Sequence, residues 1–317
     1  MKTKKIIAFI IVAVMSALLI CGCNAGKDDT IKIGIAAPDV THGWVAGAAY
    51  YAEKYCKENN IKFKITTASD AAEMTANLND LVTWGADAIV TWPQWSGMED
   101  SVADIIAQGI PVVSFDIDIA CDGVYKVTGN NYDMGYQSAK YIVNLVGDGA
   151  VIAVFDVPSA GSVSELRKAG FYAYLDEINY DKSNMFEISE TAFGRENGLA
   201  DMTDVLTSHD KIDAVFSMDD ENSIGILQAC VEAGRTDIKA ITGGGGMQEY
   251  FRMIKDEKNA SYGLASALYS PQMVQEAIKT AIDLCEGKPS EKEIVIDTSI
   301  VTKDNVDNYL DDNNKVY

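Results

Sequence analysis

The sequence predicts an α/β protein with two doubly wound lobes, each built on a parallel β-sheet, joined by a hinge that the chain crosses three times. Short apolar runs rich in β-branched residues alternate with helical patterns, which is typical of βαβ units. The same alternation starts again after Asn131. The chain has 317 residues, of which 48% are hydrophobic, and this is enough apolar material for two cores because single cores stop growing near this size.

The first half of the chain supplies the elements of the first lobe. Strands are predicted at residues 31–37, 61–66, 86–92, 110–118 and 124–127, and helices at 43–59, 71–84 and 96–108. In the central run at 110–118, IPVVSFDID, Pro111 suits the first position of a strand. The apolar residues that follow Pro111 predict a strand that is buried on both faces.

Asp116 stands where this central strand leaves its sheet. Because open α/β sheets bind ligands beyond the carboxyl ends of their parallel strands, we interpret Asp116 as a binding residue. The alternative is that its carboxylate only caps the next turn. Asp118 follows two residues later and either joins the same site or braces Asp116.

The second half of the chain repeats this arrangement. Strands are predicted at 150–155, 185–191, 213–217, 238–242 and 259–265, and helices near 133–146 and at 162–177, 195–208, 220–233 and 247–256. The segments Trp84–Val90 and Asp210–Phe216 echo each other, since both run from a helix end through Asp-Ala into an apolar strand. We therefore expect two lobes of similar construction.

The last part of the chain is expected to pass between the lobes. A long helix from Ser270-Pro271 to Glu286 has no parallel partner left in the second lobe, so it returns to the first. Residues 293–301 and a last helix then cross back. The predicted lobes are 31–129 plus 270–297 and 130–269 plus 298–317. A hinge between two such lobes leaves a cleft that faces the strand ends of both.

The N-terminus carries a pattern that we interpret as a targeting signal. Lysines precede an apolar run at residues 6–20, which is too short for a comfortable membrane span, and the sequence Cys-Gly-Cys follows. This junction resembles a bacterial lipobox, in which residues 1–22 are removed and the Cys23 thiol is lipid-modified. Residues 23–30 are then a polar tether, and acyl chains anchor the protein at the outer face of the cytoplasmic membrane. The alternative is an ordinary secreted protein cut nearby.

Charge and cysteine usage exclude several classes of partner. Removal of residues 1–22 takes away three of the 26 Lys and Arg and none of the 47 Asp and Glu, so the formal charge falls from −21 to −24. Such a surface repels nucleic acid, and we expect no nucleic-acid partner. The remaining cysteines lack metal-binding spacing and the chain has two histidines, so we expect no metal and no cofactor. Free buried thiols are expected, with a bridge between Cys56 and Cys285 as the alternative.

Four motifs spread along the chain carry a family resemblance. They are Gly109–Asp116 (GIPVVSFD), Gly129–Gly135 (GNNYDMG), Arg167–Phe171 (RKAGF) and Asp213–Asp220 (DAVFSMDD). Together with the lipobox and the two lobes, they resemble the type I periplasmic-binding-protein family, in its ribose-binding-like, carbohydrate-transporter branch. The resemblance covers about residues 31–300. It implies two lobes that close on a ligand.

The resemblance also implies a set of ligand-binding positions. The polar ones are His42, Asp116, Glu165 and Asp219, and the aromatic ones are Trp44, Trp92, Phe193 and Tyr269. Asp118 and Trp95 complete the candidate set. The alternative for Asp118 is that it only braces Asp116, and the alternative for Trp95 is a position in the core. Flat aromatic rings suit the C–H faces of a neutral sugar, and carboxylates suit its hydroxyl groups.

The chain departs from the ribose-binding pattern at several of these positions. Ile117 and Glu165 stand where the ribose binders have arginines, and Trp92 stands in place of a strand-end asparagine. Arg167, in the RKAGF motif, is expected to have a structural or supporting role. These departures argue against a ribose-type site.

The resemblance implies a monomeric, extracytoplasmic solute-binding lipoprotein that captures a small neutral sugar and delivers it to an ABC importer permease. The alternatives are a polyol, an organic cation held by cation–π attraction, or a sensor for a kinase or chemoreceptor. We do not expect an enzyme, because the sequence shows no nucleophile elbow, no Ser/His/Asp set and no metal ligands. The signal pattern and the missing DNA-binding helices exclude a DNA-binding regulator.

Overall fold

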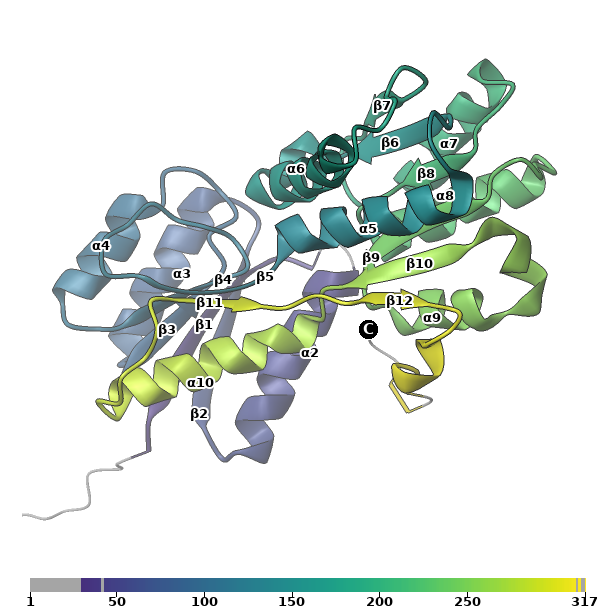
Figure 1. Cartoon of the computed structure of the whole chain (residues 1–317). Coiled ribbons are helices and arrows are strands. Elements are labelled where there is room, and N and C mark those ends of the chain that lie inside the picture. The colour runs from purple at the N-terminus through teal and green to yellow at the C-terminus, as the bar shows by residue number, and fades with distance from the viewer. Residues whose placement is uncertain (1–29, 41–42, 312, 315–316) are drawn as a thin grey trace, which may run out of the picture. The chain divides into compact units, whose positions relative to one another are not determined.

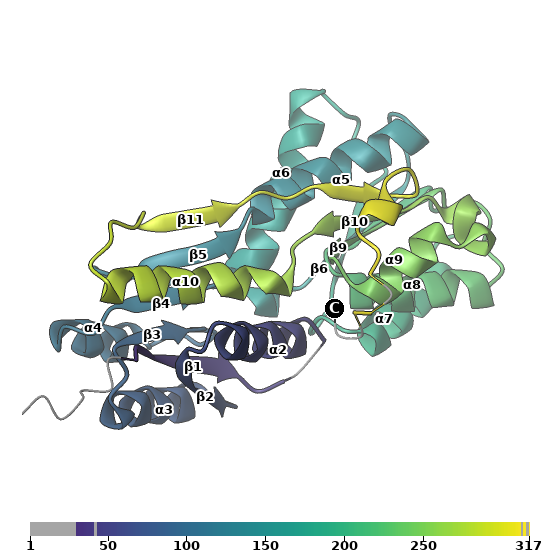
Figure 2. The ribbon, with the colours of Figure 1, turned by 90° about the horizontal axis from the view of Figure 1, so that it is seen from below.

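Two six-stranded sheets organise the part of the chain that the structure, a computed structural model, describes (Figures 1 and 2). The described residues are 30–40, 43–311, 313–314 and 317. The predicted signal segment, Cys23 and His42 lie outside them. Lys32–Tyr317 forms one compact unit.

The first sheet has the strand order β11-β5-β4-β3-β1-β2, and all of its pairs are parallel. Its strands are β1 (Lys32–Pro38), β2 (Lys62–Ala68), β3 (Ala88–Thr91), β4 (Val112–Phe115), β5 (Tyr125–Gly129) and β11 (Glu293–Ile296). The helices beside it are α2 (Gly43–Glu58), α3 (Ala71–Trp84), α4 (Glu99–Ala107) and α10 (Val274–Cys285). Helix α2 packs against α10, and α3 packs against α4.

The second sheet has the order β12-β10-β9-β8-β6-β7 and is parallel except for the edge strand β12. Its strands are β6 (Ile152–Asp156), β7 (Phe186–Ser189), β8 (Ala214–Phe216), β9 (Ala240–Gly245), β10 (Leu264–Leu268) and β12 (Ile300–Thr302). Its helices are α5 (Asn131–Val146), α6 (Ser162–Glu177), α7 (Arg195–Ser208), α8 (Asp220–Glu232) and α9 (Gln248–Lys255).

Both faces of the second sheet are covered by helices. On β6, Ile152 and Val154 pack with α5 and α6, whereas Ala153 and Phe155 pack with α7, α8 and α9. Successive strand residues point to opposite faces, so this alternation places a hydrophobic core on each side. The structure therefore confirms the predicted α/β class with two doubly wound lobes.

Local capping explains why helix boundaries could be predicted closely. The predicted helix at 71–84 is α3: Asp70 Oδ1 accepts a hydrogen bond from the Glu73 amide at 2.8 Å, and Glu73 Oε2 accepts one from the Ser69 amide at 2.8 Å. Gly85 ends the helix in the left-handed conformation, with φ at 82°. Asp70 therefore caps the start of the helix, Glu73 binds the residue before this cap, and a glycine caps the other end.

Two predictions about the C-terminal third are wrong. The strand predicted at 259–265 begins only at Leu264, because Glu257–Tyr262 forms a 3-10 helix that is capped by the Asp256 side chain. The last helix reduces to one 3-10 turn, Val306–Asn308. The segment at 293–301 is two strands in different sheets, β11 and β12.

Three connections carry the chain from one sheet to the other. They follow β5 at Asn130, follow β10 at Tyr269, and link β11 to β12 through residues 297–299. The 3-10 helix at Pro271–Met273 leads the second of them into α10. These connections bring the carboxyl ends of both sheets toward the same region, since Asp116 after β4 and Gly245 at the end of β9 line one cavity.

Helices α5 and α6 cross at very short range because each has a glycine at the crossing. A Cβ atom on Gly135 would lie 1.8 Å from the Arg167 carbonyl oxygen, and one on Gly170 would lie 1.8 Å from the Tyr132 carbonyl oxygen. These two glycines belong to the GNNYDMG and RKAGF motifs. The motifs therefore describe a helix contact that also holds Arg167 in place.

We expect Gly170→Ala to lower the free energy of unfolding by about 3 kcal/mol, near the upper end for overpacking, because the obstructing atom is backbone. Urea unfolding followed by circular dichroism measures this. Lys140→Ala, at an exposed position of α5, is the matched control and should change little. Equal stability of Gly170→Ala and the control would contradict the close helix crossing.

Candidate functional site

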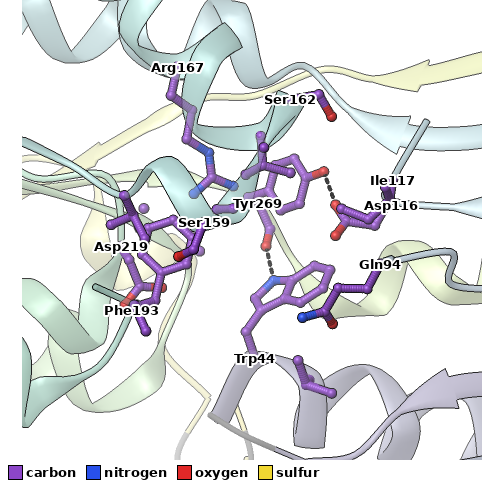
Figure 3. Close-up of a pocket in the computed structure, with 18 of the residues that line it drawn as sticks. Trp44, Gln94, Asp116, Ile117, Ser159, Ser162, Arg167, Phe193, Asp219 and Tyr269 are labelled. Atoms are coloured by element: carbon purple, nitrogen blue, oxygen red, sulfur yellow. Dashed lines mark hydrogen bonds between the residues drawn. The ribbon is translucent and has the colours of Figure 1, made fainter. Parts of the chain in front are cut away.

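A cavity of about 290 Å³ lies where the carboxyl ends of strands from both sheets meet (Figure 3). This is near the lower limit of typical small-molecule sites. The first sheet and its helices contribute Trp44, Val45, Trp92, Gln94, Asp116 and Ile117 to the lining. The second contributes Val157, Ser159, Ala160, Gly161, Ser162, Val163, Arg167, Ala192, Phe193, Asp219, Gly244 and Gly245, and Tyr269 comes from a connection between them.

Asp116 is held on its backbone and on its side chain. It follows β4 directly, and its φ of 69° places it in the left-handed region, which Asp tolerates better than most residues. Its amide donates to the Val127 carbonyl at 2.9 Å, and its carbonyl accepts from Thr128 Oγ1 at 3.0 Å. Of the two carboxylate oxygens, Oδ2 accepts from Trp92 Nε1 at 3.1 Å and Oδ1 accepts from the Tyr269 hydroxyl.

The Tyr269 phenol stays protonated beside this carboxylate. Burial, and after it the charge of Asp116, raises the pKa of Tyr269. The ring of Tyr269 packs on Gly129, where a Cβ atom would lie 2.3 Å from Cε2 of the ring. Its hydroxyl also lies 3.3 Å from Asn131 Nδ2. Tyr269 therefore links the carboxylate to two of the connections between the sheets.

The aromatic side of the cavity is a packed cluster rather than a set of loose rings. Trp44 stacks on Phe115 with the ring centroids 6.0 Å apart and the planes 5° apart, and it meets the edge of Trp92 at 5.4 Å. Trp44 Nε1 donates to the Tyr269 carbonyl at 2.6 Å (Figure 3). Both tryptophans have a satisfied N–H and a fixed ring plane, so they present rigid apolar surface to the cavity.

Arg167 is the main lining residue that sequence reasoning placed elsewhere. Its Nε donates to Asn131 Oδ1 at 2.9 Å, and NH1 donates to the Met218 carbonyl at 2.8 Å. Its guanidinium carbon lies 4.8 Å from the Tyr269 ring centroid and 5.9 Å from that of Phe193. The supporting role expected for Arg167 therefore accompanies a position in the cavity wall.

Asp219 combines a structural task with its place in the lining. It is the N-cap of α8, where Oδ1 accepts from the amides of Glu221 at 2.8 Å and Asn222 at 3.1 Å. Its side chain is buried. The helix N-terminus favours a carboxylate there, so Asp219 stays in place without a ligand.

The structure does not bring Trp95, Asp118 or Glu165 into the described lining of the cavity. Trp95 packs against the core formed with α3 and α4. The Asp118 side chain is 65% exposed and lies 3.5 Å from Lys126 Nζ. Glu165 is exposed because it lies two residues from Arg167 on α6, about 200° around the helix. His42 lies outside the described residues, so its role remains a prediction.

Sequence reasoning missed Gln94, Ser159 and Ser162 as lining residues. Gln94 follows β3, Ser159 lies in the connection that follows β6, and Ser162 is the first residue of α6. The signal that could have found them is their position, because every loop after a parallel strand opens toward the same edge of the sheet. Their residue types alone carry no such signal.

No group of His, Cys, Asp and Glu among the described residues is arranged to hold a metal ion. In the same part of the chain, Cys56, Cys121, Cys230 and Cys285 are unpaired, and Cys56 does not meet Cys285 in a bridge. The charged groups in the cavity wall are two carboxylates, Asp116 and Asp219, and the guanidinium of Arg167. Such a wall offers acceptors and donors around apolar rings.

Three comparisons with known proteins agree on one family. A family model described as the periplasmic binding protein domain matches residues 33–289. The ribose import binding protein of Bacillus subtilis is 29% identical over 86% of this chain and 87% of its own. The xylitol-binding protein of Mycolicibacterium smegmatis is 25% identical over 93% of this chain and 84% of its own.

Solved structures share the fold over most of the chain. An ABC transporter periplasmic solute-binding protein from Actinobacillus succinogenes with bound D-allose has a TM-score of 0.80 at 19% identity and covers 88% of this chain and 100% of its own. An ABC transporter solute-binding protein from Mycobacterium smegmatis with bound glycerol has a TM-score of 0.79 at 25% identity. It covers 91% of this chain and 99% of its own. These similarities confirm the predicted fold class and the family resemblance.

A buried carboxyl group supports the loop that carries Phe193. Glu190 is 3% exposed; one of its oxygens accepts from Asn222 Nδ2, and the other has no partner among the described residues. Asn222 Oδ1 in turn accepts from the Gly194 amide. Burial, and next the charge of Asp201, raises the pKa of Glu190 to about 8.

We expect this carboxyl group to make the protein less stable as pH rises. Its folded-state pKa lies above the unfolded value of about 4.3, so its stabilising proton is present below that value and is lost as pH rises through about 8. The free energy of unfolding of Glu190→Gln should therefore depend less on pH than that of wild type. Above pH 8 it should be a few kcal/mol higher than that of wild type. Urea unfolding at pH 5, 7 and 9 measures this. Glu187→Gln, at an exposed position of β7, is the control, and parallel pH profiles for both variants would contradict the prediction.

Proposed function

The chain belongs to the periplasmic binding protein family, and from that premise we propose that it captures a small neutral sugar and delivers it to an ABC importer. Proteins of this family bind solutes rather than transform them, and they act outside the cytoplasm. The observation that carries the proposal is the cavity at the strand ends, where fixed aromatic rings face two carboxylates and an arginine. Ribose and xylitol, after which two relatives are named, and the D-allose bound in a third support the same ligand class.

The chemistry of the wall fits a polyhydroxylated ligand. Asp116 lines the cavity and can also accept bonds from ligand hydroxyls, because each oxygen of a carboxylate can accept more than one hydrogen bond. Hydrogen bonds to charged groups contribute about 1.5 to 3 kcal/mol each. Trp44 and Phe193 supply flat apolar surface for the C–H faces of the ring.

A polyol is the second candidate, and an organic cation is disfavoured. The xylitol-binding relative and the glycerol-bound structure support the polyol. Arg167 lies in the cavity wall with a permanent positive charge, which offsets one of the two carboxylates there and so weakens the attraction for a cation. Ile117 lines the cavity where ribose binders have an arginine, which argues against ribose itself.

We also propose that residues 1–22 are removed, that Cys23 carries the lipid anchor, and that residues 23–30 are a tether. The lysines, the apolar run and the Cys-Gly-Cys junction support this. No helix within the described ranges combines the length and apolar character needed to cross a membrane. We further propose that the protein is a monomer. We also propose lobes at 31–129 plus 270–297 and 130–269 plus 298–317, and these boundaries are supported by the positions of β11 in the first sheet and β12 in the second.

Thermal unfolding of residues 24–317 against pentoses, hexoses, deoxysugars, polyols and organic cations tests the proposed ligand class. A ligand at about 100 times its dissociation constant adds roughly 2.7 kcal/mol of stability, a shift of a few degrees for a chain of this size. We expect one neutral sugar or polyol to give this shift. A response to a cation alone, with silence across the sugars and polyols, would refute the proposal.

Asp116→Asn is expected to weaken binding of the sugar found in that screen by about 10- to 100-fold, because it removes the charge from a hydrogen-bond acceptor that lines the cavity. Isothermal titration calorimetry measures the change. Asp118→Asn is the matched control, because Asp118 is two residues away, exposed and outside the described lining. Equal affinities for both variants would place the ligand elsewhere.

A further inference from the structure

A contact away from the cavity wall joins the start of α2 to the second sheet's helices. The amide of Gly43, the first residue of α2, donates to Glu221 Oε1 at 2.9 Å. Glu221 lies in the first turn of α8. The first amides of a helix have no partner within the helix, and the helix dipole favours a carboxylate beside them. Glu221 therefore satisfies an amide that only a group from outside α2 can satisfy.

Tyr317 lies beside this contact and is 2% exposed. A Cβ atom on Gly47 of α2 would lie 3.0 Å from Tyr317 Cβ, and one on Gly245 of β9 would lie 2.5 Å from the Tyr317 hydroxyl. The ring therefore occupies a slot between a helix of the first sheet and a strand of the second. In both views of the ribbon, the end of the chain, marked C, lies between α2 and the helices of the second sheet (Figures 1 and 2).

Hydrogen bonds hold Tyr317 to α2 as well. Its main-chain oxygen accepts from the Tyr51 hydroxyl at 3.3 Å and from Asn314 Nδ2 at 2.7 Å. Asn314 Nδ2 also donates to the Tyr51 hydroxyl at 2.7 Å. Tyr51 is itself buried, so these bonds form in a largely dehydrated environment.

A few residues earlier, the chain is held to the second sheet's side. Gln248 Nε2 of α9 donates to the Tyr309 carbonyl at 3.0 Å, and Gln248 Oε1 accepts from the Asp311 amide at 2.8 Å. Val306 belongs to the core that α7, α8 and α9 form. The described residues Tyr309, Asp311, Asn314 and Tyr317, which we name the C-terminal strap, therefore lead from α9 to α2.

We propose that the C-terminal strap is a latch that ties α2 to the second lobe and holds the cleft closed. It is a further link between the sheets, and it differs from the three connections because non-covalent contacts alone attach it to α2. Opening of the cleft separates α2 from β9 and α8. It therefore breaks the Gly43 to Glu221 bond and withdraws the Tyr317 ring from its slot.

The latch affects ligand affinity through the population of the closed state. A ligand that binds only the closed form has an apparent dissociation constant equal to its intrinsic value divided by the closed fraction. A strap that raises the closed fraction tenfold therefore tightens apparent binding by up to tenfold. This proposal concerns the closure of the cleft and does not depend on the identity of the ligand.

Tyr317→Ala tests the strap without any ligand. We expect its radius of gyration by small-angle X-ray scattering to be larger than that of wild type, because the cleft opens. The Gly43 amide should also exchange its hydrogen at least tenfold faster, because it loses its Glu221 partner. Tyr50→Ala is the matched control, since Tyr50 lies on the same helix but is 46% exposed, and it should match wild type in both measurements.

An unchanged radius and unchanged Gly43 exchange in a folded Tyr317→Ala would overturn the proposal. If circular dichroism shows that Tyr317→Ala does not fold, Tyr51→Phe decides, with Tyr50→Phe as its control. Tyr51→Phe removes only the hydroxyl that contacts the strap, and we expect faster Gly43 exchange in it alone. Equal exchange in the two Phe variants would overturn the latch. Failure of the sugar screen leaves these readouts untouched, so the two proposals fail separately.

Discussion

The carboxylate of Asp116 at the end of β4 is the constraint on which the rest of the site depends. A partly buried carboxylate is stabilised by hydrogen-bond donors around it, and here the donors are the Trp92 indole and the Tyr269 hydroxyl. Trp92 comes from the neighbouring strand end, and Tyr269 comes from a connection between the sheets. One charged group therefore sets the position of an aromatic wall and of a hinge residue together.

The opposite wall of the cavity is built around two acidic groups of the second lobe. One of them caps a helix, and the other is buried with hydrogen-bond donors around it. Asp219 caps α8 and lines the cavity. The next residue, Asp220, is fully buried and accepts bonds from the Gly246 and Met247 amides, each at 2.8 Å. Burial raises the pKa of Asp220 to about 7. The loop after β9 is thus tied to the start of α8, which gives the cavity a rigid floor at Gly244 and Gly245.

Particular residues show how far sequence reasoning reaches. Asp116 could be placed in the cavity because it follows a strand that an apolar run predicts, whereas the family resemblance placed Asp219 and Phe193 there. Glu165 could not be excluded from the sequence, since its exposure depends on the rotation of α6, and the same rotation turns Arg167 inward. Trp95 and Asp118 lie only a few residues past cavity positions. The loops there nevertheless turn Trp95 toward the core and Asp118 toward Lys126.

The sequence by itself determined the alternation of strands and helices and the repeat of that pattern in two halves. These features depend on local propensity and on period, which neighbouring residues define. Only the tertiary structure decided which side chains share the cavity. The Asp116 to Tyr269 contact joins residues 153 positions apart, and the Gly43 to Glu221 contact joins residues 178 apart. Contacts of that range depend on how two independent sheets are brought together, and no local pattern encodes it.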